Sequence, residues 1–291
     1  MANLKEIRNR ISSVSSTMQI TSAMKMVSAA KLKKAQDAIT AMRPYSDKLT
    51  EILQSLSATM EGDAVSKFTE QREVNKALVV AITSKRGLAG AFNSNIIKEL
   101  TRLNQNELKG VAVSYMAIGK KANDFVSKAS PVQSNKSDLF DNISYDNVAV
   151  IAEELMELFI TEEFDKIVIV YNSFKNAATQ IVMTEDFLPL KPVVKDEDAL
   201  QEQKELDYIF EPSKEEIIEE LIPKSLKMQL YKGVRDSWAS EHGARMTAMH
   251  KATDNATELR DQLKLTYNKA RQAAITNEIL EIVGGAEALN D

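Results

Sequence analysis

The sequence contains no cysteine, which excludes disulfide bonds, thiolate metal sites and a cysteine nucleophile. It has only 9 glycines and 6 prolines in 291 residues, which is few for a loop-rich enzyme of this length. No apolar run approaches the roughly 18 residues that a membrane-spanning helix needs. With 44% hydrophobic residues, the composition therefore favours long helices and a substantial core.

The N-terminus also lacks the apolar stretch of a signal peptide, because Lys5, Arg8 and Arg10 interrupt it. A helical periodicity begins there and continues into the body of the chain, unlike a removable transit peptide. We therefore expect a bacterial cytoplasmic protein.

Charge is spread unevenly, although the net charge is only -5. Residues 1–57 carry nine Lys and Arg against four Asp and Glu, whereas the rest of the chain is acidic. A basic end on a protein with a pI near 5.4 suggests an acidic protein partner and argues against nucleic acid.

Groups suited to catalysis or metal binding are scarce. The two histidines, His242 and His250, lie eight residues apart in a helical pattern and fit no metal-ligand spacing. No pair of Asp or Glu stands against an apolar background as a tuned acid and base. The sequence therefore predicts no catalytic residue, no cofactor site and no metal site.

A regular apolar periodicity marks residues 1–57 as a long helix. Apolar side chains recur at alternating spacings of three and four, as in a coiled coil, and Pro44 is expected to kink or split the helix. The seam positions are Leu4, Ile7, Ile11, Val14, Met18, Leu32, Ala35, Ile39, Met42, Leu49, Leu53 and Leu56. Such a helix would be about 65 to 85 Å long, which indicates a rod.

A polar gap interrupts this seam from Thr21 to Ser28, where Met24 and its neighbours turn to other faces. One interpretation is an ordinary solvated stretch. The other is a contact surface for another protein, to which Lys25, Lys31, Lys33 and Lys34 would offer positive charge.

The C-terminal segment from residue 212 to 289 is the second long helix. A capping box, with Ser213 as N-cap and Glu216 at N3, marks its start, and a kink is expected at Pro223. Spacings of three and four define a seam of mostly small residues: Met249, Ala252, Ala256, Leu259, Leu263, Thr266, Ala270 and Ala273. The helical pattern continues past this seam, so we expect its last part to bind another protein. Gly284 and Gly285 lie where a helix is expected to end.

Residues 74–190 alternate short apolar runs with helical patterns, which predicts a Rossmann-like α/β domain with a parallel or mixed sheet. We expect strands at 77–82, 111–118, 166–171 and 180–183, and helices after the first strand and at 148–159. Residues 191–211 form a charged connector. The fold class is thus α/β plus a long coiled coil, in which the two terminal helices pair antiparallel and the α/β domain is inserted between them.

A glycine-containing loop at 83–90 follows the first predicted strand, in the position where many proteins bind phosphate. It matches neither GxxxxGK[ST] nor GxGxxG followed by an acidic residue. A tight turn explains Gly87 and Gly90 equally well. A nucleotide-binding α/β enzyme with helical extensions nevertheless stays an alternative, as does a plain coiled-coil adaptor.

Stretches throughout the chain resemble the gamma-subunit family of F-type ATP synthases. They are MKMVSAAKL (24–32), RPY (43–45), TSKRGLAGAFN (83–93), ARMTAMHKATDNA (244–256) and YNKARQAAITNEILEIVGGAEAL (267–289). The motifs at the two ends are highly specific, and the resemblance is weakest at 62–73 and 188–210.

This resemblance implies a non-catalytic rotor shaft. In the family, the terminal helices form a coiled coil inside a ring of three alpha and three beta subunits. The α/β domain sits below the ring, beside epsilon and on the c-ring. Proton flow turns the c-ring and the shaft, which drives each beta subunit in turn through its nucleotide states. The chain would be peripheral at the cytoplasmic face of the bacterial inner membrane.

The matched motifs also imply partner contacts. The residues that would meet the acidic lever segment and the catch loop of beta are Met24, Lys25, Arg245, Arg271, Gln272, Thr276 and Glu278. Those that would turn in the apolar sleeve of the ring include Ile279, Ile282, Val283 and Leu289.

Overall fold

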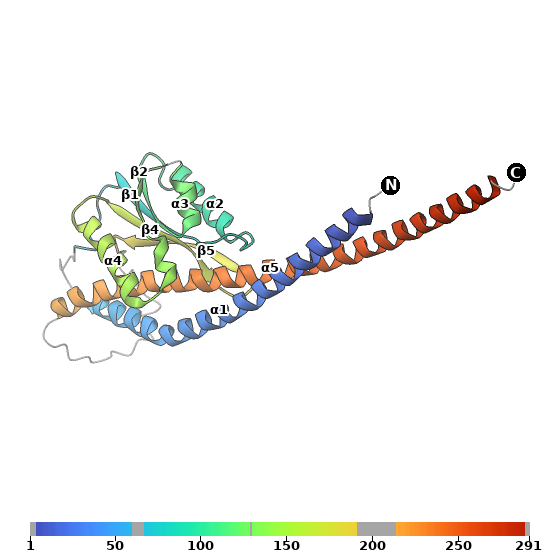
Figure 1. Ribbon diagram of the computed structural model, residues 1–291. Helices are drawn as coiled ribbons and strands as arrows, with labels where there is room; N and C mark the ends of the chain where they lie inside the picture. Colours follow the sequence, from blue (N-terminus) through green and yellow to red (C-terminus); the bar gives the residue numbers. More distant parts are fainter. Residues whose placement is uncertain (1–3, 60–66, 129, 191–213, 289–291) are drawn as a thin grey trace. The chain divides into compact units, whose positions relative to one another are not determined.

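A computed structural model describes residues 4–59, 67–128, 130–190 and 214–288 (Figure 1). Helix α1 (Leu4–Thr59) precedes a mixed α/β sheet in sequence, and helix α5 (Lys214–Ala288) follows it. The chain divides into two compact units: Met1–Ala29 together with Arg245–Asp291, and Ala30–Ala244. The predicted class, a Rossmann-like α/β sheet plus long terminal helices, is confirmed. Within the four described ranges, no helix is both long and apolar enough to span a membrane.

Both long helices continue through residues that were expected to interrupt them. Pro44 lies inside the 56-residue α1, and Pro223 lies inside the 75-residue α5. The expected helix end at Gly284 and Gly285 is wrong, because α5 continues to Ala288. A β-carbon added to either glycine would meet nothing within 4 Å, so no neighbouring segment forces the chain to turn there. Glycine in a helix costs only about 1 kcal/mol relative to alanine.

The sheet has five strands in the order β3-β2-β1-β4-β5. Strands β1 (Lys76–Ile82), β2 (Ala112–Ile118), β3 (Val132–Asn135) and β4 (Lys166–Phe174) run parallel, whereas β5 (Gln180–Leu188) pairs antiparallel with β4. The crossover helices are α2 (Phe92–Gln105), α3 (Lys120–Val126) and α4 (Tyr145–Ile160), and a 3-10 turn spans Ser137–Asp141.

Strand β1 is buried on both faces, as its continuous apolar run predicts. Leu78, Val80 and Ile82 belong to a core shared with α4 and α5. Their neighbours Ala77, Val79 and Ala81 face a second core formed with α2 and α3. Because side chains alternate along a strand, only a strand covered by helices on both sides needs apolar residues at every position.

The sequence reading missed α3, β3 and the 3-10 turn, and it ended the last strand five residues early. Strand β3 has only four residues, Val132 to Asn135, and lies at the sheet edge, so it carries no buried apolar run. The predicted connector at 191–211 and the predicted N-cap Ser213 lie outside the described residues.

Candidate partner-binding surface of the helical pair

The N-terminal part of α1 pairs antiparallel with the C-terminal part of α5 inside one compact unit (Figure 1). Arg8 Nη2 donates a hydrogen bond of 2.8 Å to the Tyr267 hydroxyl, and its guanidinium also lies 5.7 Å from the centre of that ring. Farther along, the Thr257 hydroxyl contacts Met18 Sδ at 3.3 Å. As residue numbers rise along α1 they fall along α5, so the predicted antiparallel orientation is confirmed.

The predicted seam of α1 is confirmed over its described side chains. In this unit Ile7 is buried, and the other apolar seam residues up to Met18 are half-buried. In the second unit the seam continues with buried Leu32, Ala35, Ile39, Met42 and Leu49. The side chains of Leu53 and Leu56 lie outside the described part of the structure.

The polar gap is a hydrogen-bonded part of the same seam. Thr21 is 8% exposed, and its Oγ1 lies 2.8 Å from Oγ1 of Thr253 on α5. Ser28 is also buried and donates to the Met24 carbonyl at 2.8 Å. These two hydroxyl groups are therefore neither solvated nor available to a partner. Met26 and Val27, in contrast, are more than half exposed.

The predicted register of the α5 seam is partly wrong. Five of its residues are buried or half-buried, as predicted: Met249, Ala252, Ala256, Leu263 and Ala270. Leu259, in contrast, is 47% exposed, and Thr266 and Ala273 are exposed too. The residues that turn inward in place of these three are Arg260, Tyr267 and Ala274, one position later in each case, and Thr253 is half-buried beside Ala252. From Ala256 onward the alternation therefore takes a spacing of four where three was expected.

Direct bonds to α1 explain this register. The inward positions place the Arg260 guanidinium 3.5 Å from Met18 Sδ and the Tyr267 hydroxyl against Arg8. Sequence reasoning missed Thr253, Arg260 and Tyr267 because it looked for small and apolar residues. A count that began with a spacing of four would have found them.

Beyond Ala274 the described α5 side chains, up to Gly285, are all exposed. Among the predicted contacts, Arg271, Gln272, Thr276 and Glu278 are exposed, and each of Ile279, Ile282 and Val283 is more than half exposed. Leu289 lies outside the described residues. Within the described chain, then, nothing covers this apolar helix end.

The remaining predicted contacts are less accessible. Met24 and Lys25 are half-buried, so each offers only part of its side chain to a partner. Arg245 is only 8% exposed. A partner could therefore touch little of Arg245.

The loop after β1 is occupied by contacts within the protein. Lys85 Nζ lies 2.7 and 2.6 Å from the two carboxylate oxygens of Asp141, and the Ser84 backbone N–H donates to Asn93 Oδ1 at 3.0 Å. Helix α2 begins with buried Phe92 behind this loop. The lysine and a backbone donor that would hold a phosphate are thus already paired, which disfavours the nucleotide-binding alternative.

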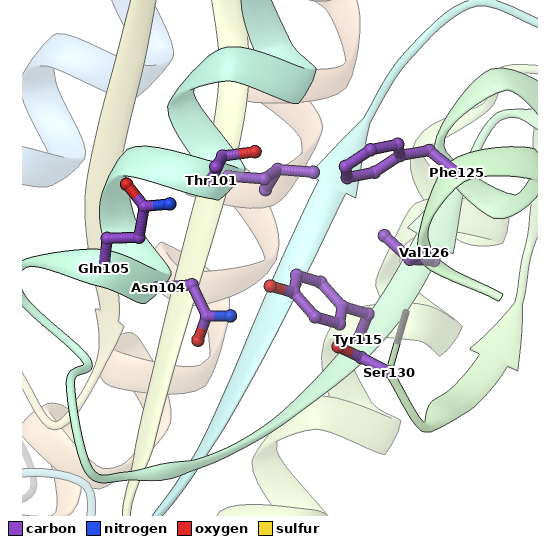
Figure 2. A pocket seen from close by; sticks show the side chains of 8 residues that line it. Thr101, Asn104, Gln105, Tyr115, Phe125, Val126 and Ser130 are labelled. Carbon is purple, nitrogen blue, oxygen red and sulfur yellow. The ribbon is translucent and has the colours of Figure 1, made fainter. Parts of the chain in front are cut away.

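One cavity of about 190 Å³ lies between α2, α3 and β2 (Figure 2). Leu100, Phe125 and Val126 form its apolar part, and the Tyr115 ring stands between the two helices. Burial raises the pKa of Tyr115. The residues that line this cavity include no carboxylate, histidine, lysine or arginine, so it offers no acid–base pair.

No group of three or more histidine, aspartate and glutamate side chains gathers as a metal site in the part of the chain that the structure describes. His250 lies 3.3 Å from Asp254 on the exposed face of α5, an ordinary pair one helical turn apart.

Comparisons with known proteins agree with the long-helix architecture. The family model described as "ATP synthase" matches residues 3–289. The ATP synthase gamma chain of Flavobacterium psychrophilum is 71% identical, over 99% of both chains. A chain in the cryo-EM structure of the Euglena gracilis mitochondrial ATP synthase, OSCP/F1/c-ring, is similar with a TM-score of 0.68 at 23% identity, covering 98% of this chain and 94% of that one. A chain of the Tetrahymena thermophila mitochondrial ATP synthase, central stalk/c-ring, has a TM-score of 0.57 at 25% identity, covering 80% and 99%.

Proposed function

This chain belongs to the ATP synthase gamma-chain family, and we propose that it is the rotating shaft of an F1Fo ATP synthase. It is a non-catalytic subunit of that complex, since catalysis lies on the beta subunits. Its partners are the alpha and beta subunits, epsilon and the c-ring.

One observation carries this proposal: helix α5 continues past the end of its pairing with α1 as a single exposed helix with large apolar side chains. Leu280, Ile282 and Val283 are each more than half exposed. Exposed apolar residues in such a continuous row mark a surface that a partner covers. A sleeve formed by a ring of subunits would cover all sides of the helix at once.

The surface just below this end supplies the polar contacts. We propose that Arg271 and Gln272 hydrogen-bond the catch loop of beta, with Thr276 and Glu278 next to them. Met24, Lys25 and the exposed edge of Arg245 would meet the acidic lever of beta. Ile279, Ile282, Val283 and Leu289 would form the bearing.

Rotation can act on beta only if the shaft contacts its conformations differently, because equal contact shifts no equilibrium. The helical pair provides such asymmetry. Close to the Thr21–Thr253 contact, Met26 and Val27 on α1 present exposed apolar side chains, whereas His250 and Lys251 on α5 present exposed polar ones. Each beta subunit would therefore meet a different surface as the shaft turns.

We further propose that residues 74–190 form the foot of the shaft, residues 1–57 and 212–289 its coiled coil, and 191–211 a connector. Attachment to the membrane is peripheral and comes through the complex. The bacterial relatives favour the cytoplasmic face of the inner membrane for this chain.

Reconstitution of alpha and beta subunits with and without this chain tests the proposed function. We expect steady ATP hydrolysis from the three subunits together, and an ATP-driven rotation of a bead attached to residues 74–190. Hydrolysis by alpha and beta with the same kinetics in its absence, or ATP binding by the purified chain alone, would show that the proposal is wrong.

The Arg271→Ala variant tests the contact surface, with Lys269→Ala as the matched control on an exposed position of the same helix. We expect Arg271→Ala to impair assembly or torque while leaving the thermal stability of the isolated chain within about 0.5 kcal/mol, because the side chain is exposed. A large drop in melting temperature would instead place Arg271 in the fold.

A further inference from the structure

A stripe of α5 residues fastens this helix to strands β4 and β5 within the Ala30–Ala244 unit. Gln229 Nε2 donates to Glu185 Oε2 at 3.3 Å and to the Asp186 carbonyl at 3.4 Å. Seven and eleven residues later, Asp236 accepts a hydrogen bond of 3.2 Å from the Ser173 hydroxyl, and Ser240 donates to the Asn172 carbonyl at 3.1 Å. These spacings place all three residues on one face of the helix.

Two glycines lie in the same stripe and let the helix approach closely. A β-carbon added to Gly233 would lie 3.6 Å from the Tyr171 ring, and one added to Gly243 would lie 3.2 Å from the Ala177 Cα. Tyr171 is itself buried and donates to Glu185 Oε1 at 2.6 Å. Glu185 thus joins β4, β5 and α5 through a single carboxylate.

A separate ridge of α5 supplies the apolar contact with the domain. Its residues recur every four positions and are buried in the same core as β4: Ile222, Leu226, Leu230 and Val234. Burial of apolar area holds the helix against the sheet but has no preferred direction. Hydrogen bonds weaken steeply when their distances and angles change. The polar stripe therefore resists rolling and sliding of the helix, whereas the apolar ridge resists only its separation from the sheet.

We propose that Gln229, Asp236 and Ser240 form the torque-bearing joint between the α/β domain and the shaft helix, with Glu185, the Ser173 hydroxyl and the Asn172 carbonyl as their respective partners on the sheet. This inference rests on the proposed function. Torque that enters the domain from one partner can pass into α5 through this joint on its way to another partner. The joint prevents the helix from rolling on its apolar ridge under that load.

Two replacements of one residue test the joint. Gln229→Glu places a second carboxylate against Glu185, whereas Gln229→Lys places a cation there with a side chain of similar reach. In the complete complex, we expect Gln229→Glu to lower the ratio of ions pumped to ATP hydrolysed by about threefold or more. Gln229→Lys and the exposed control Lys232→Ala should keep the ratio of the unaltered complex.

The absence of cysteine allows a reversible covalent rescue. The pair Ala177→Cys and Gly243→Cys, added to the Gln229→Glu chain, offers a disulfide across the joint, because a β-carbon at Gly243 would lie 3.2 Å from the Ala177 Cα. We expect oxidation to restore the pumping ratio and reduction to lower it again. The Ala177→Cys and Gly243→Cys pair in the otherwise unaltered chain is the control for any effect of the cysteines themselves.

The outcomes separate the joint from the function on which it rests. If the unaltered complex shows no rotation of the domain during hydrolysis, the shaft proposal itself fails. If rotation is normal but Gln229→Glu keeps full coupling, or loses hydrolysis and pumping in equal proportion, these bonds only support the fold. Should neither charged variant assemble, Tyr171→Phe removes one bond of the joint with almost no change of volume and must lower the ratio in the same direction.

Discussion

The buried hydroxyl pair of the shaft allows a quantitative prediction. Thr21 and Thr253 face each other across the two helices at 2.8 Å, and each hydroxyl also lies near a carbonyl of its own helix, 3.1 Å from Met18 O and 2.8 Å from Met249 O. One hydroxyl can therefore donate its hydrogen to the carbonyl of its own helix, while the other donates to the partner hydroxyl. Replacement by valine keeps the shape and removes only the polar atoms.

We expect Thr21→Val to cost about 1 kcal/mol of local stability, the usual net worth of one hydrogen bond. Thr253→Val should cost about the same. The double variant should cost no more than either single one, because replacing both partners by apolar groups leaves no buried polar atom unpaired. The interaction energy from the cycle is then about 1 kcal/mol.

Hydrogen exchange of the α1 amides around residue 21 measures this quantity locally, without requiring that the two units of the chain unfold together. Thr40→Val is the matched control, since Thr40 is exposed and donates a hydrogen bond to the Gln36 carbonyl of its own helix. If the double variant costs the sum of the two single ones, the hydroxyls do not interact and the polar gap has another role.

Three further changes have clear expected outcomes. Gly119→Ala should destabilise the domain by about 3 kcal/mol or more, because φ is +117° and the added carbon would lie 2.2 Å from the Thr83 carbonyl oxygen. Glu99→Gln should cost about 1 kcal/mol at pH 7, because it removes the charge that pairs with Arg102 at 2.6 Å. Glu107→Gln should cost less, because Glu107 binds the same guanidinium at 3.0 Å from a more exposed position. Leu259→Gln should cost under about 0.5 kcal/mol, since this side chain is 47% exposed.

The pH dependence of the Glu99 effect has a defined sign. A hydrogen bond from Arg102 lowers the pKa of Glu99, with a second one from Thr184. A carboxylate with a lowered folded-state pKa stabilises the protein above its unfolded value, and this stability is lost as the pH falls through the folded value. Urea unfolding should therefore give a lower free energy of unfolding for the Glu99→Gln chain than for the unaltered one at pH 7, and this difference should vanish below about pH 4. A difference in the free energy of unfolding that grows in acid would contradict this assignment.

Urea unfolding also measures the stability of the Gly119→Ala and Leu259→Gln variants. Gly110→Ala is the control for Gly119→Ala, because Gly110 also has a positive φ, +88°, but meets nothing within 4 Å. Equal losses would show that the backbone angle alone matters, without the clash. If Leu259→Gln lowered the free energy of unfolding by more than about 2 kcal/mol, the originally predicted register, in which this leucine faces α1, would be supported instead.

How well the pattern predicted each helix depended on how distinct its seam residues are. In α1, branched and long apolar side chains such as Ile7 and Ile11 stand among polar neighbours, so only one register buries them. In α5, alanines and threonines occur at positions belonging to both possible registers. The contacts of Tyr267 and Arg260 with α1 decide between the two.

Only part of the candidate site could be predicted from the sequence. The exposed apolar end of α5 could be predicted, because its pattern continues after the seam stops. The torque-bearing stripe could not, because Gln229, Asp236 and Ser240 are ordinary polar residues until β4 and β5 are brought against them. Arg245, expected on the surface, is nearly buried.

The sequence by itself determined the two long helices, the strands buried on both faces and the family, since each follows from residue type and spacing along one segment. The tertiary structure alone decided the α5 register and the short edge strand β3. Periodicity along a chain reports which side chains avoid water. It does not report which neighbour they meet, because that depends on segments distant in sequence.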